Sequence, residues 1–189
     1  MITLPFLLAL LVAEKAAAQR YLPGQRGIQV TASAVDGFVP GTGDKRGFAF
    51  ELGMATYNNG GNRWVVAAGY LQKNKQYSGQ AIPLSQFTGE LSYYKKFLSD
   101  RSKTVFLSIG GSAMAGYETI NWGKKLLDDG ATIMDKDKFL YGGAIGLEAE
   151  TFLTDRLVML AFARERLLFS SDVSKFRFQI GIDVKYIIE

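Results

Sequence analysis

Two carboxylates with the spacing of a possible catalytic pair occur at Glu148 and Glu150, in a stretch where apolar and polar residues alternate. Residues i and i+2 of a strand project from the same face, so the two groups would lie side by side. Paired carboxylates of this kind can perform general acid–base chemistry. The sequence offers neither a base partner nor a substrate cleft, and we interpret both residues as structural carboxylates.

The residue types that most enzymes and metal sites use are missing from the chain. It contains no cysteine and no histidine. This excludes disulfides, thiolate zinc sites, Ser–His and Cys–His dyads and imidazole metal ligands. A lipoprotein anchor is excluded too, because it needs a cysteine at the mature N-terminus. We therefore predict no enzymatic activity and no cofactor.

Two further charged groups have residue types that could bind a ligand. The acidic residues of the longest predicted loop could offer oxygen ligands to Ca²⁺, but their spacing fits no EF-hand loop; they are Asp128, Asp129, Asp135 and Asp137. Arg164, Glu165 and Arg166 end a predicted strand, where they could be part of the lumen network or form a rim cluster that meets lipopolysaccharide phosphates. We favour structural salt bridges for the arginines and no metal site.

The elements that would position these residues are strands. In Lys175–Ile188, apolar residues occupy every even position from Phe176 to Ile188, and polar or small residues occupy the odd positions up to Lys185. Strict alternation predicts a strand with one apolar and one polar face. The stretch is about twice the usual strand length, and a tilted membrane-spanning strand needs roughly 9–11 residues. We interpret it as the closing strand of a transmembrane barrel.

Seven more stretches with strand-like alternation precede it, which gives an even total, as in bacterial single-chain barrels. They are Gly27–Val35, Arg46–Tyr57, Arg63–Leu71, Gln86–Phe97, Thr104–Tyr117, Phe139–Phe152 and Asp155–Leu167. The connections alternate between long and short, with long ones expected at Asp36–Lys45, Lys73–Ser85 and Glu118–Lys138. Short turns on one rim and long loops on the other indicate an all-β, eight-stranded, antiparallel up-and-down outer-membrane β-barrel with both termini on the short-turn, periplasmic side.

The two faces of these strands indicate how the barrel is turned. One face is large, apolar and aromatic, and the other is small or charged. We predict a lumen charge network of Glu51, Glu90, Lys96, Glu148, Glu150, Arg177, Asp183 and Lys185. An eight-stranded lumen is just wide enough for side chains to fill, and buried charges must be paired. A soluble calycin-like binder, the fold-level alternative, would place its large apolar groups inside around a ligand. Aromatic residues near strand ends suit interfacial girdles; these are Tyr70, Tyr93, Tyr94, Phe97 and Tyr186.

The N-terminus has the features of a secretion signal. Ile2–Val12 is an apolar run interrupted only by Pro5, and Ala16–Ala18 supplies the small residues that a signal peptidase prefers. The run is too short to span a membrane. We predict a signal peptide at residues 1–18 and a single barrel domain at residues 19–189. A membrane anchor or a mis-annotated start codon is the alternative.

The longest loop is the best candidate for contact with a partner, because long loops often carry function. We predict a possible partner-docking loop that includes Asn121, Trp122, Lys124, Lys125, Asp128 and Asp129. A capping loop with a solvated charge run is the alternative. The net charge of +4 is spread along the chain with no basic stripe, so we expect no direct nucleic-acid binding and no small-molecule substrate.

Short segments spread over nearly the whole chain, in the same order, resemble the TraO family of conjugative transposon proteins. They are Tyr21-Leu22-Pro23-Gly24, Gly27-Ile28-Gln29-Val30-Thr31, Gly61-Asn62-Arg63-Trp64, Ala115-Gly116-Tyr117-Glu118, Asn121-Trp122-Gly123, Asp129-Gly130-Ala131, Phe139-Leu140-Tyr141-Gly142-Gly143, Glu148-Ala149-Glu150-Thr151 and Arg164-Glu165-Arg166. The resemblance implies a component of a conjugative DNA-transfer apparatus, a type IV secretion-like machine, placed at the outer membrane. It implies no catalytic residue.

These observations together predict a non-enzymatic outer-membrane protein of a Gram-negative bacterium that anchors or assembles a conjugation machine. Its expected partners are outer-membrane lipid, lipopolysaccharide and other machine proteins. One rival is a generic small surface barrel of the adhesion or stress type that binds through its long loops. Another is a lipid-A-modifying enzyme, but enzymes of that kind generally rely on a histidine.

Overall fold

The structure is a computed structural model of the chain, and it describes residues 21–36, 47–77, 80–101, 103–124, 132, 137–169 and 175–188. The predicted signal peptide and Lys125, Asp128, Asp129 and Asp135 lie outside these residues.

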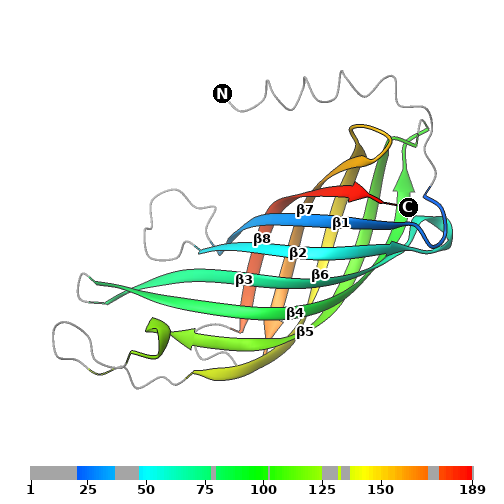
Figure 1. Cartoon of the computed structure of the whole chain (residues 1–189). Helices are drawn as coiled ribbons and strands as arrows, with labels where there is room; N and C mark the ends of the chain where they lie inside the picture. Colours follow the sequence, from blue (N-terminus) through cyan, green and yellow to red (C-terminus); the bar gives the residue numbers. More distant parts are fainter. Residues whose placement is uncertain are drawn as a thin grey trace, which may run out of the picture.

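Eight strands follow one another in the described chain, and two short 3₁₀ turns lie between them. The strands are β1 (Arg26–Val35), β2 (Gly47–Tyr57), β3 (Arg63–Tyr77), β4 (Gln80–Ser99), β5 (Val105–Ile120), β6 (Lys138–Phe152), β7 (Leu157–Leu168) and β8 (Phe176–Ile187). The turns are η2 (Asn59–Gly61) and η3 (Asn121–Gly123). Each strand pairs antiparallel with the next, and β1 pairs with β8, which closes the barrel (Figure 1). The predicted all-β, eight-stranded up-and-down barrel is confirmed.

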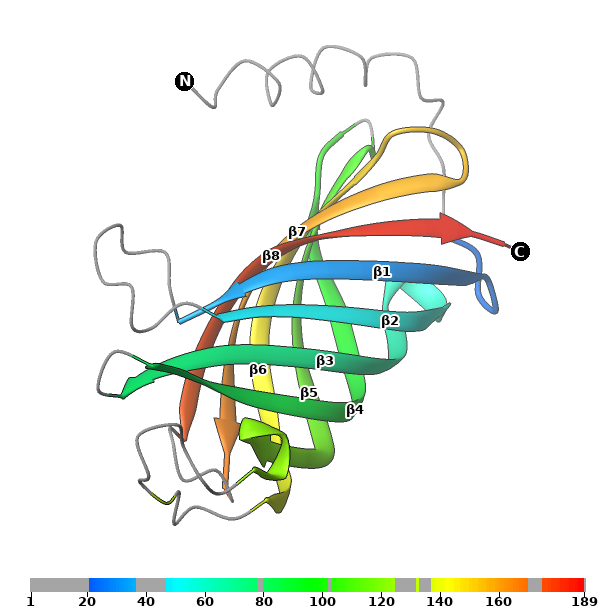
Figure 2. The same cartoon turned by 60° about the vertical axis from the view of Figure 1, so that its left-hand side comes forward.

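The two ends of the barrel differ. The turn end, as we call it, holds the short connections at residues 58–62, 100–104 and 153–156, together with the start of β1 and the end of β8. The opposite loop end holds the ends of β1, β3, β5 and β7 and the starts of β2, β4, β6 and β8 (Figures 1 and 2). Gly60 and Gly61 take φ values of 78° and 81° in the turn after β2, which glycine adopts without a steric penalty.

The predicted long loop at Lys73–Ser85 is wrong. The ladder between β3 and β4 continues from Lys73↔Leu84 to Tyr77↔Gln80, so the two strands form a long hairpin. The pairing of β2 with β3 already ends at Gly47↔Lys73. The hairpin therefore projects beyond its neighbours at the loop end, as Figure 1 shows. The polar run from Gln72 to Gln76, followed by Ser78, Gly79 and Pro83, gives this stretch the composition of a loop.

The strands face apolar side chains outwards and polar ones into the lumen. In β8, for example, Phe178, Ile180 and Ile182 are exposed, whereas Arg177 and Gln179 are buried. Exposed aromatic residues gather on the outer surface near both ends. The loop-end belt comprises Phe48, Phe87, Tyr117, Tyr141, Phe169 and Phe176, and the turn-end belt comprises Trp64, Phe97 and Tyr186, with the half-buried Tyr93 against Trp64. Apolar outside and polar inside is the pattern of outer-membrane-type barrels.

Tyr94 is an exception to the predicted girdle. It is buried and points into the lumen, because it is one residue out of phase with Tyr93 on β4. Its ring covers the backbone of Gly110 on β5, where an added Cβ would lie 2.2 Å from Tyr94 Cδ1. A glycine at position 110 leaves the space that this buried ring occupies.

Three apolar clusters lie among the buried polar groups of the lumen. The turn-end cluster includes Tyr21, Tyr57, Phe106, Phe152 and Val158. Two smaller clusters lie towards the loop end, one around Leu140 and Leu168 and one around Val35 and Leu71.

Candidate functional site: buried charge layers and the loop-end turn

Glu150 on β6 is the centre of a buried polar cluster near the turn end. Its carboxylate accepts hydrogen bonds from the hydroxyl of Tyr21 and, at 2.9 Å, from that of Tyr57. It also accepts 3.1 Å bonds from Arg63 Nη1 and Lys185 Nζ. Four donors from four segments of the chain thus meet at one carboxylate.

Glu148, two positions before Glu150, binds the other terminal nitrogen of Arg63. The Arg63 side chain is 1% exposed, and two carboxylates bind its guanidinium in place of solvent. Carboxylates held in ion pairs within a closed barrel lack both the free base and the substrate access that acid–base catalysis needs. The arrangement favours the structural interpretation of this pair.

Tyr21, which precedes β1, packs inside the lumen at the turn end. Its ring stacks on that of Tyr57 at a centroid distance of 3.9 Å and also contacts Phe106 and Phe152. The backbone around it is tied to the end of β2, since Gly24 N–H donates to the Tyr57 carbonyl at 2.8 Å. Burial, together with the neighbouring Glu150 carboxylate, raises the pKa of the Tyr21 hydroxyl well above its usual value.

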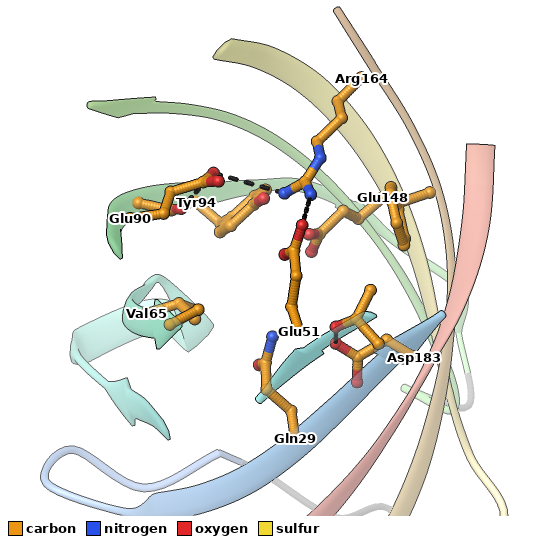
Figure 3. A pocket seen from close by; sticks show the side chains of 12 residues that line it. Gln29, Glu51, Val65, Glu90, Tyr94, Glu148, Arg164 and Asp183 are labelled. Atoms are coloured by element: carbon orange, nitrogen blue, oxygen red, sulfur yellow. Dashed lines mark hydrogen bonds and ion pairs between the residues drawn. The ribbon is translucent and has the colours of Figure 1, made fainter. Parts of the chain in front are cut away.

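A second charged layer lies further towards the loop end, where two arginines of β7 share two carboxylates. Arg164 binds Glu51 and, at 3.3 Å, Glu90. Arg166 binds the same two groups at 2.6 and 2.8 Å. Figure 3 shows Arg164 pointing between Glu51 and Glu90, which come from different strands. Gln179 accepts a further 2.6 Å bond from Arg164 Nε. Buried charges are stable only when paired in this way.

The remaining buried polar groups extend these layers. Gln86 donates a 2.5 Å hydrogen bond to Glu118, which also lies 3.5 Å from Arg177 Nη2 near the loop end. Asp183 accepts a 2.7 Å bond from the Thr31 hydroxyl. The interior is therefore a set of interstrand pairs that link most of the barrel wall.

The central part of the lumen is filled by these side chains. The space left among the residues around Glu51, Glu90, Glu148, Arg164 and Asp183 is about 20 Å³, enough for about one water molecule. An eight-stranded barrel packed in this way has no continuous passage for a macromolecule. Any interaction with a partner must use the rims or the outer wall.

The structure places most of the predicted lumen residues inside the barrel. Glu51, Glu90, Glu148, Glu150, Arg177, Asp183 and Lys185 line the lumen. Lys96 does not join the charge layers. It lies near the turn end with Nζ 5.0 Å from the Phe106 ring centroid, close to the irregular register between Lys96 and Leu98.

Three buried arginines were not among the residues assigned to the predicted network, although structural salt bridges were the favoured interpretation of two of them, Arg164 and Arg166, and both form such bridges. The three are Arg63, Arg164 and Arg166, and their positions follow from the period-two alternation of β3 and β7. Arg164 and Arg166 share the face of the buried Phe162, so the parity of β7 could have assigned both to the lumen. Both faces of that strand are apolar at one end, so the sequence alone did not show which face points into the lumen. Glu165, between them, is exposed on the outer wall.

The described part of the predicted docking loop forms an exposed turn at the loop end. Asn121 and Trp122 in η3 take positive φ values of 51° and 53°, a conformation that costs non-glycine residues energy. The carboxylate of Asp137 accepts a 3.2 Å bond from the Ile120 N–H, and the Asn121 side chain donates to the Lys124 carbonyl at 2.9 Å. These bonds hold Trp122 on the surface, 57% exposed and 6.4 Å from Phe87 between ring centroids.

Metal sites and helical spans are both missing from the part of the chain that the structure describes. Its residues contain no group of three or more metal-ligating acidic, histidine or cysteine side chains. Within the same residues, no helix is long and apolar enough to cross a membrane.

The sequence profile described as "Conjugative transposon protein TraO" matches residues 22–188. The chain belongs to the TraO family. The match covers almost all of the described barrel, from the segment after Tyr21 to the end of β8. No curated protein matches the chain by sequence.

Two solved structures share the barrel fold with this TraO-family chain. One is Neisserial surface protein A, with a TM-score of 0.55, 14% identity and coverage of 85% of this chain and 96% of the other. The other is Ail, the attachment invasion locus protein of Yersinia pestis, in complex with the heparin analogue sucrose octasulfate, with a TM-score of 0.57, 13% identity and coverage of 88% and 100%. At such low identity, these similarities show the fold alone. Neither the family nor the fold matches indicate an enzymatic family.

Proposed function

We propose that this TraO-family protein is a non-enzymatic outer-membrane component of a conjugative transposon's DNA-transfer apparatus, which it anchors or helps to assemble. Membership of the TraO family supports the link with transfer. The apolar outer wall with aromatic belts near both ends supports a place in a bilayer. In this proposal residues 1–18 are a cleaved export signal, residues 19–189 form the barrel, and the turn end faces the periplasm.

The filled lumen is the observation that supports an anchoring role. Charged pairs and apolar clusters occupy the interior, so the protein acts as a fixed wall and not as a conduit. An anchoring component needs a stable barrel that presents surfaces to other proteins. The η3 turn with the exposed Trp122 is one such surface, since buried aromatic anchors dominate the binding energy of many interfaces.

Mating frequency from a donor with an in-frame deletion of this gene tests the proposal. We expect transfer to fall by several orders of magnitude and to be restored by the intact gene. A Trp122→Ala variant with a Tyr70→Ala control, another aromatic residue on the outer wall, then tests the loop-end surface. Unchanged transfer from the deletion strain, with the protein present in the outer membrane of the wild type, would refute the assembly role.

In that case a surface barrel that binds through its loop end becomes the better description. The exposed Trp122, held in a strained turn by Asp137, is the observation that favours this second candidate. Adhesion or ligand binding by intact cells that is lost in the Trp122→Ala variant would support it.

A further inference from the structure

Glu165 on β7 faces outwards from the barrel wall, unlike the arginines on either side of it in the sequence. Its register partners on the neighbouring strands are Ile145 on β6 and Phe178 on β8, both of them exposed and apolar. The described part of the chain provides no hydrogen bond or ion pair to its carboxylate. Glu165 thus has no counter-ion among the described residues, and the neighbouring carboxylate of Asp36, which repels it, is itself paired with Lys73.

The position of Glu165 along β7 places it inside the apolar band and below the aromatic belt. Phe169 lies four residues further towards the loop end, where it stacks with Tyr141 at a centroid distance of 5.7 Å. Four residues of a tilted strand span roughly 10 Å along the barrel axis. Phe176 of the same belt is the register partner of Leu167, two residues from Glu165. If aromatic belts mark the membrane interfaces, the carboxylate lies just below the interface, at the edge of the hydrocarbon region. Ionisable groups at this depth are costly and usually mark a functional contact.

A shallow apolar groove continues from Glu165 towards the turn end. It has a volume of about 320 Å³, and its floor is formed by small outward-facing residues, chiefly Ala149, Ala161 and Ala163. Larger side chains, including Leu147 and Ile180, line its sides. Glu165 is the next outward-facing residue after Ala163 on β7, so the carboxylate stands at the loop-ward end of the groove.

We propose that this groove and Glu165 form a lateral docking site for a membrane-spanning helix of another protein that carries an arginine or lysine. Small residues allow a helix to approach the wall closely, which is how transmembrane segments associate without a hydrophobic driving force. A cation at the height of Glu165 would neutralise its charge away from water. A lipid chain could fill the groove but has no donor for the carboxylate.

A second copy of this chain is a poorer occupant. Arg26 and Lys95, the other charged strand residues that face outwards, lie near the turn end. Lys73, near the loop end, is already paired with Asp36 at 2.9 Å. Copies inserted in the same orientation keep Arg26 and Lys95 at a different depth from Glu165. A twofold contact through the groove would also bring two Glu165 carboxylates together.

The test uses the full barrel in phosphatidylcholine vesicles and a synthetic membrane-spanning helix of leucine and alanine with one arginine in its outer third. A matched helix has leucine in place of that arginine. Because the chain contains no cysteine, an Asn59→Cys variant allows one dye to be placed at the turn end for energy-transfer measurements. We expect the arginine helix to associate roughly tenfold more tightly than the leucine helix.

Three variants decide the assignment. Glu165→Leu should reduce binding of the arginine helix to the level of the leucine helix. Ala161→Phe, which fills the groove, should weaken binding of both helices, whereas Leu52→Phe on β2 should leave binding unchanged. Ala149→Phe replaces Ala161→Phe if that variant does not fold.

Equal binding of both helices to the wild type would overturn the proposal, and so would full arginine preference after Glu165→Leu. The double variant Glu165→Leu, Leu52→Glu moves the carboxylate away from the groove. If it keeps the full preference for the arginine helix, the groove is irrelevant and the proposal is overturned. Self-association of the wild type that displaces the arginine helix counts against it as well. The vesicles contain no transfer machinery, so this result and the mating result can fail independently.

Discussion

The inner and outer faces of β7 place three consecutive charged residues in opposite environments. Arg164 and Arg166 point into the lumen, where each binds both Glu51 and Glu90. Glu165 points out of the barrel between Ile145 and Phe178 and has no polar partner among the described residues. The pleat of the strand alone causes this separation. On the inner face of one strand, charged residues stabilise the barrel, whereas a charged residue on its outer face remains available to a partner.

The first prediction concerns the inner face, where the largest effect is expected. Glu150→Leu leaves Arg63 and Lys185 buried with their main partner removed. Breaking a buried ion pair by removal of one partner costs about 3–5 kcal/mol. We expect a loss of that order in the free energy of unfolding, measured by urea titration of the barrel in lipid vesicles. A loss under about 1 kcal/mol would mean that the lumen charges are already solvated.

The second prediction concerns packing in the lumen. Gly110→Val places a side chain where the ring of Tyr94 lies, since even a Cβ would be 2.2 Å from Cδ1 of that ring. Overpacking costs about 1–3 kcal/mol. The double variant Gly110→Val, Tyr94→Ala should recover part of this loss in the same urea titration. If Tyr94→Ala adds to the loss instead, a clash with the Tyr94 ring does not explain the effect of Gly110→Val.

The third prediction uses the turn-end cluster and pH. Tyr21→Phe removes the hydroxyl that donates to Glu150 but keeps the ring stacked on Tyr57. A hydrogen bond to a charged group contributes about 1.5–3 kcal/mol. Because the folded-state pKa of Tyr21 is raised, its contribution is fully present below the unfolded pKa near 10 and is lost as pH rises above it.

Unfolding titrations of the wild type and Tyr21→Phe from pH 8 upwards check this pH dependence. The wild type should lose more stability than the variant above about pH 10, because only the wild type has the hydroxyl to ionise. Parallel curves for the two proteins would contradict the proposed role of the hydroxyl.

The smallest effect is expected on the outer face. Glu165→Leu should leave the free energy of unfolding unchanged or raise it by on the order of 1 kcal/mol, because a lipid-facing carboxylate is itself unfavourable. The same urea titration measures it, with Leu147→Ala as a control for loss of outer-wall surface. A loss of several kcal/mol on Glu165→Leu would show that the carboxylate has an internal partner and would remove the contrast between the two faces of β7.

The sequence by itself determined much of the barrel. Alternation with a period of two is a local property, so it identified eight strands, their even number, the apolar outer face and most of the lumen carboxylates. Short segments of the chain were also enough to indicate the TraO family. The local pattern could not predict that β3 and β4 continue as a paired hairpin beyond Lys73 and Leu84, because the polar residues of that part have the composition of a loop.

Only the tertiary structure decided which charges meet. Glu51 and Arg166 are far apart in the chain, and the order of strands around the closed barrel together with their register sets their 2.6 Å contact. The parity of β7 was ambiguous until closure assigned one face to the lumen, which sent Arg164 inwards and Glu165 outwards. Alternation in the sequence thus divides residues between two faces. The register of the closed sheet chooses their partners, because a shift of a single residue would move every side chain of a strand to the other face.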